Sequence, residues 1–206
     1  KQAYEVNRGL VGPRRGLKDR GVMGECFGAL QATGHRVGHR GHAALRVVSE
    51  AISLGYRHID TAAFYKNEVS VRRAVRECGL DRRELFVPSK VWNTDRGYDK
   101  TLAAFQRTLD NLGLEFLDLY LIHWPANKRQ FADCDRINAE TWRALEELYL
   151  AGRIRAIGVS NFYPDRFVDL AEFCEIKPAV NQVATHVFNQ QVKDRELMAK
   201  NGTRME

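Results

Sequence analysis

Several short apolar runs of this sequence end in a side chain that can move a proton or form strong hydrogen bonds. These ends are Asp60, Lys90, His123 and the pair 160–161, and Tyr65 follows Asp60 by five residues. A tyrosine hydroxyl has an ordinary pKa of about 10, so it is a slow proton donor at neutral pH. A lysine ammonium about 4 Å away favours the tyrosinate by about 4 kcal/mol at an effective dielectric constant near 20. That is equivalent to about three pKa units.

Lys90 is therefore expected to bring the pKa of Tyr65 towards 7, provided that Asp60 fixes its position without cancelling its charge. His123 is expected to orient a substrate oxygen by a hydrogen bond. No Ser or Cys stands with a base in a nucleophile arrangement, and no carboxylate pair is evident. Such a set fits acid catalysis at a carbonyl group, which needs a hydride donor that side chains cannot supply. The alternatives are ordinary loop residues, or an Asp60–Lys90 ion pair with only a structural role.

Alternating strands and helices must bring these residues together. Strand-like runs at 56–60, 85–90, 117–123, 154–160 and 179–182 end 30, 33, 37 and 22 residues apart. Between them, apolar residues recur at helical spacing, as in the run from Leu102 to Leu112 that stops at Gly113. Asn138 is expected to be the N-cap of a later helix that closes at Gly152.

Repeats of this length suit right-handed parallel crossovers, which build either a doubly wound sheet or a (β/α)₈ barrel. No GxGxxG pattern follows any of the runs, so the dinucleotide-binding sheet loses its main support. We therefore predict an α/β fold of the (β/α)₈ TIM-barrel class. In such a barrel the carboxyl ends of the strands meet at one mouth, where the polar residues would converge.

Composition excludes several classes of protein. The chain has 206 residues, of which 44% are hydrophobic and 28% charged, as in a globular domain. No apolar run approaches the ~20 residues of a membrane span, and residues 1–10 do not resemble a signal peptide. The four cysteines are widely spaced, which favours reduced thiols over a zinc module or disulfide scaffold. A cytoplasmic protein with no membrane partner is expected.

The net charge of +6 is unevenly distributed. Residues 1–40 contain eight Lys or Arg against three acidic residues, so all later residues together carry only +1. A basic leader on a nearly neutral body does not form the basic face of a nucleic-acid-binding fold, and no nucleic-acid partner is expected.

Four ordered motifs resemble those of the aldo-keto reductases. The stretch 55–68, GYRHIDTAAFYKNE, is similar to the first signature of that family. The stretches 121–125 (LIHWP), 157–162 (IGVSNF) and 181–183 (NQV) are similar to three more. The similarity covers residues 43–206 and lies nearest the 2,5-diketogluconate reductase and aldehyde reductase branch. It implies a (β/α)₈ barrel that reduces small aldehydes or ketones with NADPH, NADH being less expected.

The resemblance also assigns roles to individual positions. The implied catalytic residues are Asp60, Tyr65, Lys90 and His123, with Tyr65 as the general acid. The implied cofactor-binding residues are Ser160, Asn161 and Gln182, with a weaker match at Gly28 and Ala29. The implied substrate-binding residues are Trp92, Trp124 and His123, although ordinary packing at the barrel rim would also explain the tryptophans.

The two ends of the chain depart from the family pattern. Residues 1–42 hold nine of the sixteen glycines, which predicts an irregular N-terminal segment before a barrel domain at 43–206. His35, His39 and His42 in this segment could be interpreted as a metal cluster, but an irregular arm explains the composition better, and no metal is predicted. The chain stops at Glu206, so about six βα units are expected, with open sheet edges that favour self-association.

Two functions remain open. One is an NADPH-dependent oxidoreductase that reduces aldehydes or ketones to alcohols, and the other is a truncated, non-catalytic barrel that binds a nucleotide or a protein partner. The complete set Asp60, Tyr65, Lys90 and His123 favours the enzyme. The expected absence of the last units favours the non-catalytic alternative for this particular chain.

Overall fold

A computed structural model describes residues 29–31 and 41–206 of the chain. Its strands are β1 (Ala29–Gln31), β2 (His58–Asp60), β3 (Pro88–Val91), β4 (Leu119–Ile122), β5 (Ile157–Ser160), β6 (Val180–Gln182) and β7 (Arg204–Met205). Its α-helices are α3 (Gly41–Ser53), α4 (Glu68–Glu77), α5 (Tyr98–Leu112), α6 (Cys134–Leu150), α7 (Pro164–Phe173) and α8 (Val192–Lys200). Three short 3₁₀ helices are η1 (Ala63–Tyr65), η2 (Arg82–Glu84) and η3 (Asn93–Asp95). Strands and helices thus alternate along the chain.

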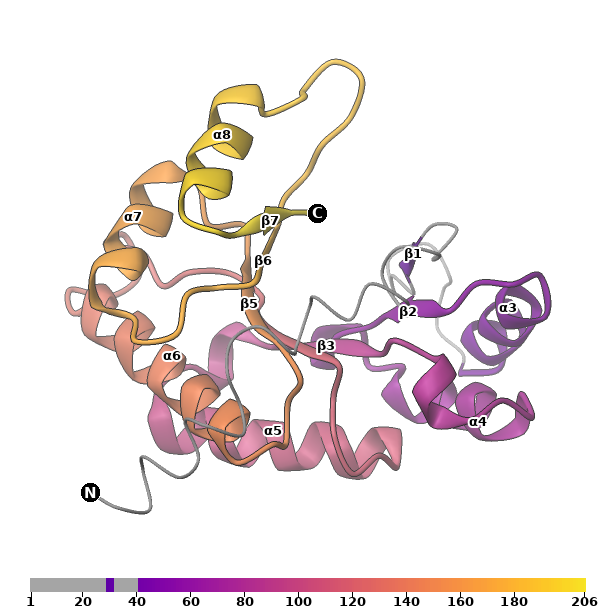
Figure 1. Ribbon diagram of the computed structural model, residues 1–206. Helices are drawn as coiled ribbons and strands as arrows, with labels where there is room; N and C mark the ends of the chain where they lie inside the picture. The colour runs from indigo at the N-terminus through magenta and orange to yellow at the C-terminus, as the bar shows by residue number, and fades with distance from the viewer. Residues whose placement is uncertain (1–28, 32–40) are drawn as a thin grey trace.

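The strands pair in parallel and in chain order. One sheet holds β1 and β2, and the other runs from β3 to β7. A parallel bridge between His58 and Phe86 joins the two sheets. Figure 1 shows the helices following one another around the outside of the strands, from α3 through α5 to α8. Among the described strands, β1 pairs only with β2 and β7 only with β6, so the ring is open between them. The predicted class, an incomplete (β/α)₈ barrel, is confirmed, and self-association stays a prediction.

Alternation along each strand sends neighbouring side chains to opposite faces of the sheet. In β4, Tyr120 and Ile122 join the apolar core between the sheet and the helices, whereas Leu119 and Leu121 belong to a second cluster. In the β3 region, Val87 and Val91 lie in the helix-side core. Lys90 directly precedes Val91 and so lies on the opposite face of the strand. Its side chain therefore points to the inner side of the incomplete barrel.

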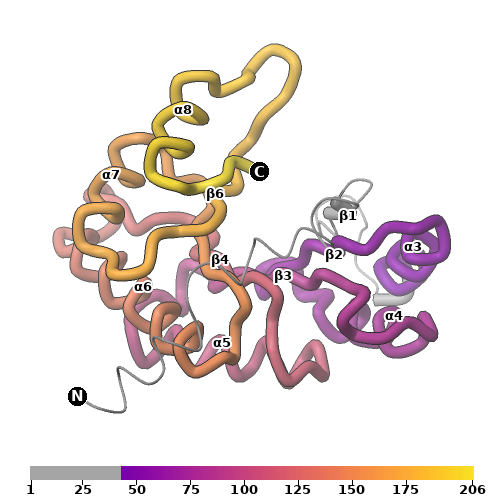
Figure 2. The backbone as a smooth tube through the Cα atoms, viewed as in Figure 1, coloured from indigo at the N-terminus to yellow at the C-terminus, as the bar shows by residue number. Residues whose placement is uncertain are grey.

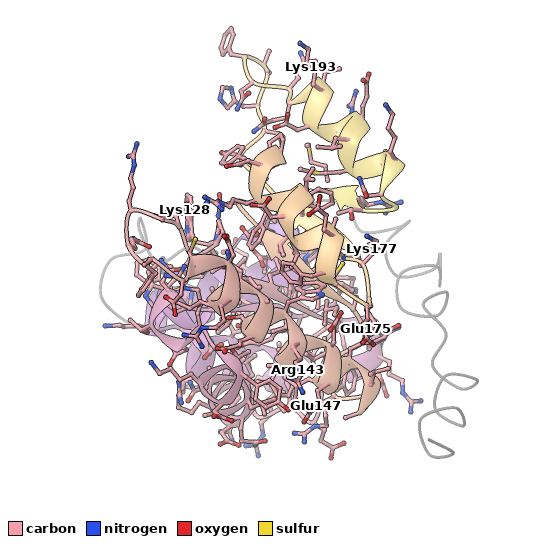
Figure 3. The ribbon with its side chains drawn as sticks, turned by 90° about the vertical axis from the view of Figure 1, so that its left-hand side faces the viewer. Lys128, Arg143, Glu147, Glu175, Lys177 and Lys193 are labelled. Carbon is pink, nitrogen blue, oxygen red and sulfur yellow. The ribbon has the colours of Figure 1, made fainter. Side chains whose placement is uncertain are left out.

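The helices bury one face and expose the other. Helix α5 ends as predicted at Gly113, whose φ of 63° is left-handed and whose N–H bonds to the carbonyl oxygen of Leu109. On the outside, the exposed side chains of Arg143 and Glu147 lie on α6, and Lys177 follows α7 (Figure 3). In the part of the chain described, no helix has the length and apolar character that a membrane span requires.

The predicted N-cap at Asn138 is wrong. Helix α6 begins at Cys134, four residues earlier, and its N-cap is Asp133. The Asn138 side chain is buried and bonds the backbone of Ala126, accepting from its N–H at 2.7 Å and donating to its carbonyl oxygen at 3.1 Å. The residue type indicated a hydrogen bond to backbone, but the partner lies in another segment of the chain.

Strand β7 was not expected from the sequence. It has only two residues, one of which is the exposed Arg204, so no apolar pattern marks it in the sequence. It is recognisable by its pairing, in which Arg204 lies opposite Val180 and Met205 opposite Asn181. The predicted boundary at residue 42 stays a prediction.

A buried ion triad at the start of β4 is expected to stabilise the fold. Asp118 is fully buried and accepts from Arg82 Nη2 at 2.6 Å, Val87 N at 2.8 Å and Arg155 Nη1 at 2.9 Å. Asp118→Ala should lower the free energy of unfolding by about 3 kcal/mol, because it leaves two cations and an N–H without their acceptor. Urea unfolding measures the loss. Arg73→Ala, which breaks an exposed pair with Glu77, should cost less than about 1 kcal/mol, and equal losses in both variants would contradict the account.

Candidate functional site

The centre of the site is a buried ion pair between β2 and β3. Lys90 Nζ donates to both carboxylate oxygens of Asp60 at 2.7 Å and to the carbonyl oxygen of Thr61 at 3.1 Å. The side chains of Lys90 and Asp60 are each only 1% exposed. Because β2 and β3 end at the same edge, the two residues meet as the strand order requires. A buried charge pair held this tightly fixes the position of the ammonium group.

Tyr65 lies directly beside this pair, at the end of η1. Lys90 Nζ is 5.4 Å from the centre of the tyrosine ring. Burial, and then the negative charge of Asp60, raises the pKa of Tyr65 to about 12. The expected lowering of this pKa by Lys90 is therefore wrong, because Asp60 balances the lysine charge and burial disfavours the tyrosinate. Tyr65 keeps its proton at neutral pH.

His123 stands at the end of β4 and faces Tyr65 edge to face. The two ring centres are 5.8 Å apart at an interplanar angle of 89°. Burial, and then the positive charge of Lys90, lowers the pKa of His123 to about 4. The imidazole is therefore neutral at physiological pH. Its Nδ1 is buried and has no hydrogen-bond partner within the described residues.

Aromatic rings pack next to His123. The ring centres of Trp92 and His123 are 5.1 Å apart. Trp92 also stacks on Phe64, with ring centres 3.8 Å apart and planes 21° from parallel. Trp124 is 44% exposed and lines the pocket described next. Phe64 was missed by the sequence analysis, although its aromatic type and its place beside Tyr65 were a usable signal.

A pocket of about 440 Å³ opens over Tyr65 and His123. It is lined by Asp60, Tyr65, His123, Trp124, Ser160, Asn161, Gln182, Val183, Ala184, Thr185 and Glu206. Gln182 is the last residue of β6. The long connection from β6 to α8 follows it and projects beyond the rest of the chain in Figure 2. Seven of the sequence-predicted site residues thus line one pocket, and Lys90 lies buried behind Asp60.

The predicted cofactor residues on β5 and β6 adjoin His123. Asn161 Nδ2 donates to the carbonyl oxygen of His123 at 2.9 Å and to Ser160 Oγ at 3.0 Å. Asn161 has a left-handed φ of 61°, a conformation that asparagine adopts more readily than most residues. Gln182 lies opposite Ser160 in the strand register. Gly28 lies outside the described residues, as do His35 and His39 of the metal alternative, and Ala29 is the first residue of β1.

Glu206 is a pocket residue that sequence reasoning missed. It follows β7, and its Oε1 lies 3.6 Å from His58 Nδ1. Burial, and then the negative charge of Asp60, raises the pKa of the Glu206 carboxyl. No sequence signal could have found this residue, because β7 itself was not expected.

The buried histidines predict how stability depends on pH. The folded-state pKa of His123 is about 4, below the ordinary histidine value of 6.5, so the unfolded chain takes up the proton first. Stability is therefore present above pH 6.5 and is lost between 6.5 and 4, by about 3 kcal/mol for this residue. Burial lowers the pKa of His58 as well, so protonation of His58 adds to the loss of stability at low pH.

Urea unfolding between pH 7 and pH 4 measures this loss. Burial raises the pKa values of Glu68 and Glu206, which acts in the opposite direction, so the comparison needs a matched variant. His123→Gln should lose less stability than the wild type over this interval. An identical pH dependence in the two proteins would contradict a buried, neutral His123.

Comparisons with known proteins agree on one family. The model of the aldo/keto reductase family matches residues 26–205. A 9,11-endoperoxide prostaglandin H2 reductase of Trypanosoma cruzi is 51% identical over 156 residues, which cover 76% of this chain and 52% of that protein. A glyoxal reductase of Bacillus subtilis is 50% identical over 166 residues, which cover 81% of this chain and 57% of that protein. The chain thus spans about half the length of these curated relatives.

Solved structures of aldo-keto reductases resemble this chain as well. An aldo-keto reductase from a Medee basin deep-sea metagenome library is 42% identical, with a TM-score of 0.79 over 86% of this chain and 61% of that one. The aldo-keto reductase of Bombyx mori, in complex with NADP, is 34% identical, with a TM-score of 0.78 over 86% of this chain and 60% of that one. The chain belongs to the aldo/keto reductase family.

Proposed function

We propose that this chain reduces aldehydes or ketones to alcohols with NADPH, with Tyr65 as the general acid. One observation carries the proposal: a single pocket brings Tyr65 and His123 together over the buried Asp60–Lys90 pair. Neither a nucleophile nor a metal is needed for such a site, because reduction of a carbonyl requires a proton and a hydride.

Tyr65 would donate the proton to the carbonyl oxygen. Its raised pKa keeps the proton on the hydroxyl until negative charge develops on the substrate oxygen. The tyrosinate left behind would be stabilised by the Lys90 ammonium, which lies 5.4 Å from the ring centre. Asp60 fixes the position of that ammonium and limits its effect. In this proposal Lys90 acts on the anion formed during the reaction, and it does not lower the pKa of Tyr65 beforehand.

His123 would orient the substrate. A neutral imidazole carries one N–H, which can donate to the same carbonyl oxygen as Tyr65. The lowered pKa of about 4 keeps the ring in this neutral form. Trp92 packs against His123 and the pocket has a volume of about 440 Å³, so a small aldehyde, ketone or dicarbonyl is proposed as the substrate. The B. subtilis relative is named a glyoxal reductase, and glyoxal is a small dicarbonyl compound.

The polar end of the pocket fits a nicotinamide. A carboxamide group donates from its NH₂ and accepts at its oxygen, and Ser160, Asn161 and Gln182 supply hydroxyl and amide groups for both. Asn161 Nδ2 is already bonded, which leaves its Oδ1 as the acceptor. When bound, the nicotinamide supplies the hydride. NADPH is proposed over NADH because the Bombyx mori enzyme was crystallised with NADP, and Gly28 and Ala29 are proposed as further cofactor contacts.

NADPH binding and turnover together test this proposal. NADPH should bind, as followed by its fluorescence, and its absorbance at 340 nm should fall after addition of glyoxal, with one alcohol group formed per NADPH. Saturable binding without any turnover in folded protein would instead support the alternative, a non-catalytic barrel that binds a nucleotide. The intact set of Asp60, Tyr65, Lys90 and His123 favours the enzyme.

A further inference from the structure

Arg96 is a buried cation with an unusual set of partners. It follows η3 in the loop after β3 and is only 7% exposed. Buried arginines are normally paired with a carboxylate. The nearby carboxylates have other partners, since Asp95 pairs with Arg107 and Glu140 with Arg136. No ion pair of Arg96 occurs in the described part of the chain, and burial lowers its pKa.

The guanidinium group of Arg96 instead contacts two different loops. Its Nε donates to the carbonyl oxygen of Asn93 at 2.9 Å, within the β3–α5 loop. Its Nη1 donates to the carbonyl oxygen of Trp124 at 3.4 Å, at the start of the β4–α6 loop. Farther along that second loop, the Phe131 ring lies with its centre 5.4 Å from Arg96 Cζ. Charge-assisted bonds to carbonyl oxygens and an aromatic face therefore take the place of a carboxylate.

Both bonded carbonyl groups adjoin the aromatic residues of the candidate site. Asn93 directly follows Trp92, whose ring meets His123 edge to face at 5.1 Å. Trp124 directly follows His123 and lines the pocket. Arg96 itself is not among the residues that line this pocket. A single side chain outside the pocket thus links the backbone beside one tryptophan to the backbone of the other.

We infer that Arg96 is a positioning residue that holds the loops after β3 and β4 together, and so sets the separation of Trp92 and Trp124 beside His123. A small substrate that reaches only Tyr65 and His123 does not depend on this separation. An aromatic aldehyde, whose ring would extend from Tyr65 and His123 to the tryptophans beside them, does. The part of this inference that concerns substrates rests on the proposed carbonyl reduction.

The positions of the tryptophans can be tested without any activity. The sequence contains three tryptophans, so the protein labelled with 5-fluorotryptophan should give three ¹⁹F NMR resonances, assigned by single Trp→Phe variants. Trp142, buried in α6, serves as the internal reference. Arg96→Leu should shift or broaden the resonances of Trp92 and Trp124 and leave that of Trp142 in place. Arg73→Leu, which removes an exposed arginine of α4, is the matched control and should move none of them.

Steady-state kinetics test the consequence for substrates. Arg96→Leu should raise KM for benzaldehyde about tenfold, because small displacements of positioning groups have large effects. KM and kcat for glyoxal should change less than about threefold. Arg96→Lys should recover part of the difference, since an ammonium retains the charge but lacks the forked geometry that reaches both carbonyl groups. A merely structural role would instead affect both substrates equally.

Each outcome decides the inference. Unmoved Trp92 and Trp124 resonances in Arg96→Leu would overturn it. Moved resonances with an unchanged ratio of the two KM values would overturn its substrate part. If the wild type binds NADPH but turns over neither aldehyde, the proposed function fails, and the NMR result alone still decides whether Arg96 positions the two tryptophans.

Discussion

Tyr65→Phe is expected to lower kcat for aldehyde reduction about 100- to 10,000-fold, the range that a positioned general acid contributes. The variant removes a hydroxyl whose proton is held at neutral pH by a pKa of about 12. The ring remains, so its contacts with His123 and Phe64 are retained. The loss should therefore appear in kcat, measured from the absorbance of NADPH at saturating aldehyde.

NADPH affinity is the control for this variant. Ser160, Asn161 and Gln182, the proposed carboxamide contacts, are unchanged, so the dissociation constant should stay within about threefold of the wild-type value. Tyr98→Phe, at a partly exposed tyrosine on α5 whose hydroxyl donates to Glu147, should leave kcat unaltered. If Tyr65→Phe kept most of the wild-type rate, Tyr65 would not be the proton donor.

Lys90→Met is expected to lower both stability and rate. The variant leaves the Asp60 carboxylate, only 1% exposed, without its cation, which should cost about 3–5 kcal/mol of unfolding free energy. The uncompensated charge of Asp60 also raises the pKa of Tyr65 further, because that charge already acts in this direction. Urea unfolding and kcat measure the two effects.

The double variant Asp60→Asn/Lys90→Met separates these effects. It removes both charges, so it should be more stable than Lys90→Met alone. Its kcat should stay low, because no ammonium then stabilises the tyrosinate. A double variant no more stable than Lys90→Met would contradict the ion-pair account, and a restored kcat would contradict the role of Lys90.

The sequence was a good guide to the inner face of the strands. Regular spacing of the apolar runs predicts parallel strands that end at one edge, and this places Asp60, Lys90 and His123 together. Tyr65 was located by its distance from Asp60 along the chain. The predictions for Asp60, Lys90 and His123 depend only on strand order and on the alternation of side chains, which a sequence carries directly.

Properties that depend on burial or on distant partners were not predictable. The pKa of Tyr65 depends on how completely Asp60 balances Lys90 and on how deeply the ring is buried, and neither is visible in the sequence. Asn138 has the residue type of a helix cap, but its partner is Ala126, twelve residues away. Glu206 directly follows β7, a strand so short that only its pairing identifies it.

The central claim is that Tyr65, His123 and the Asp60–Lys90 pair form one carbonyl-reducing site. Its most direct test incubates the chain with NADPH dideuterated at C4 of the nicotinamide and an aldehyde, followed by mass spectrometry of the alcohol. The account predicts one deuterium atom on the former carbonyl carbon with the wild type, and almost none with Tyr65→Phe. No deuterated alcohol from folded wild-type chain that binds NADPH would contradict it.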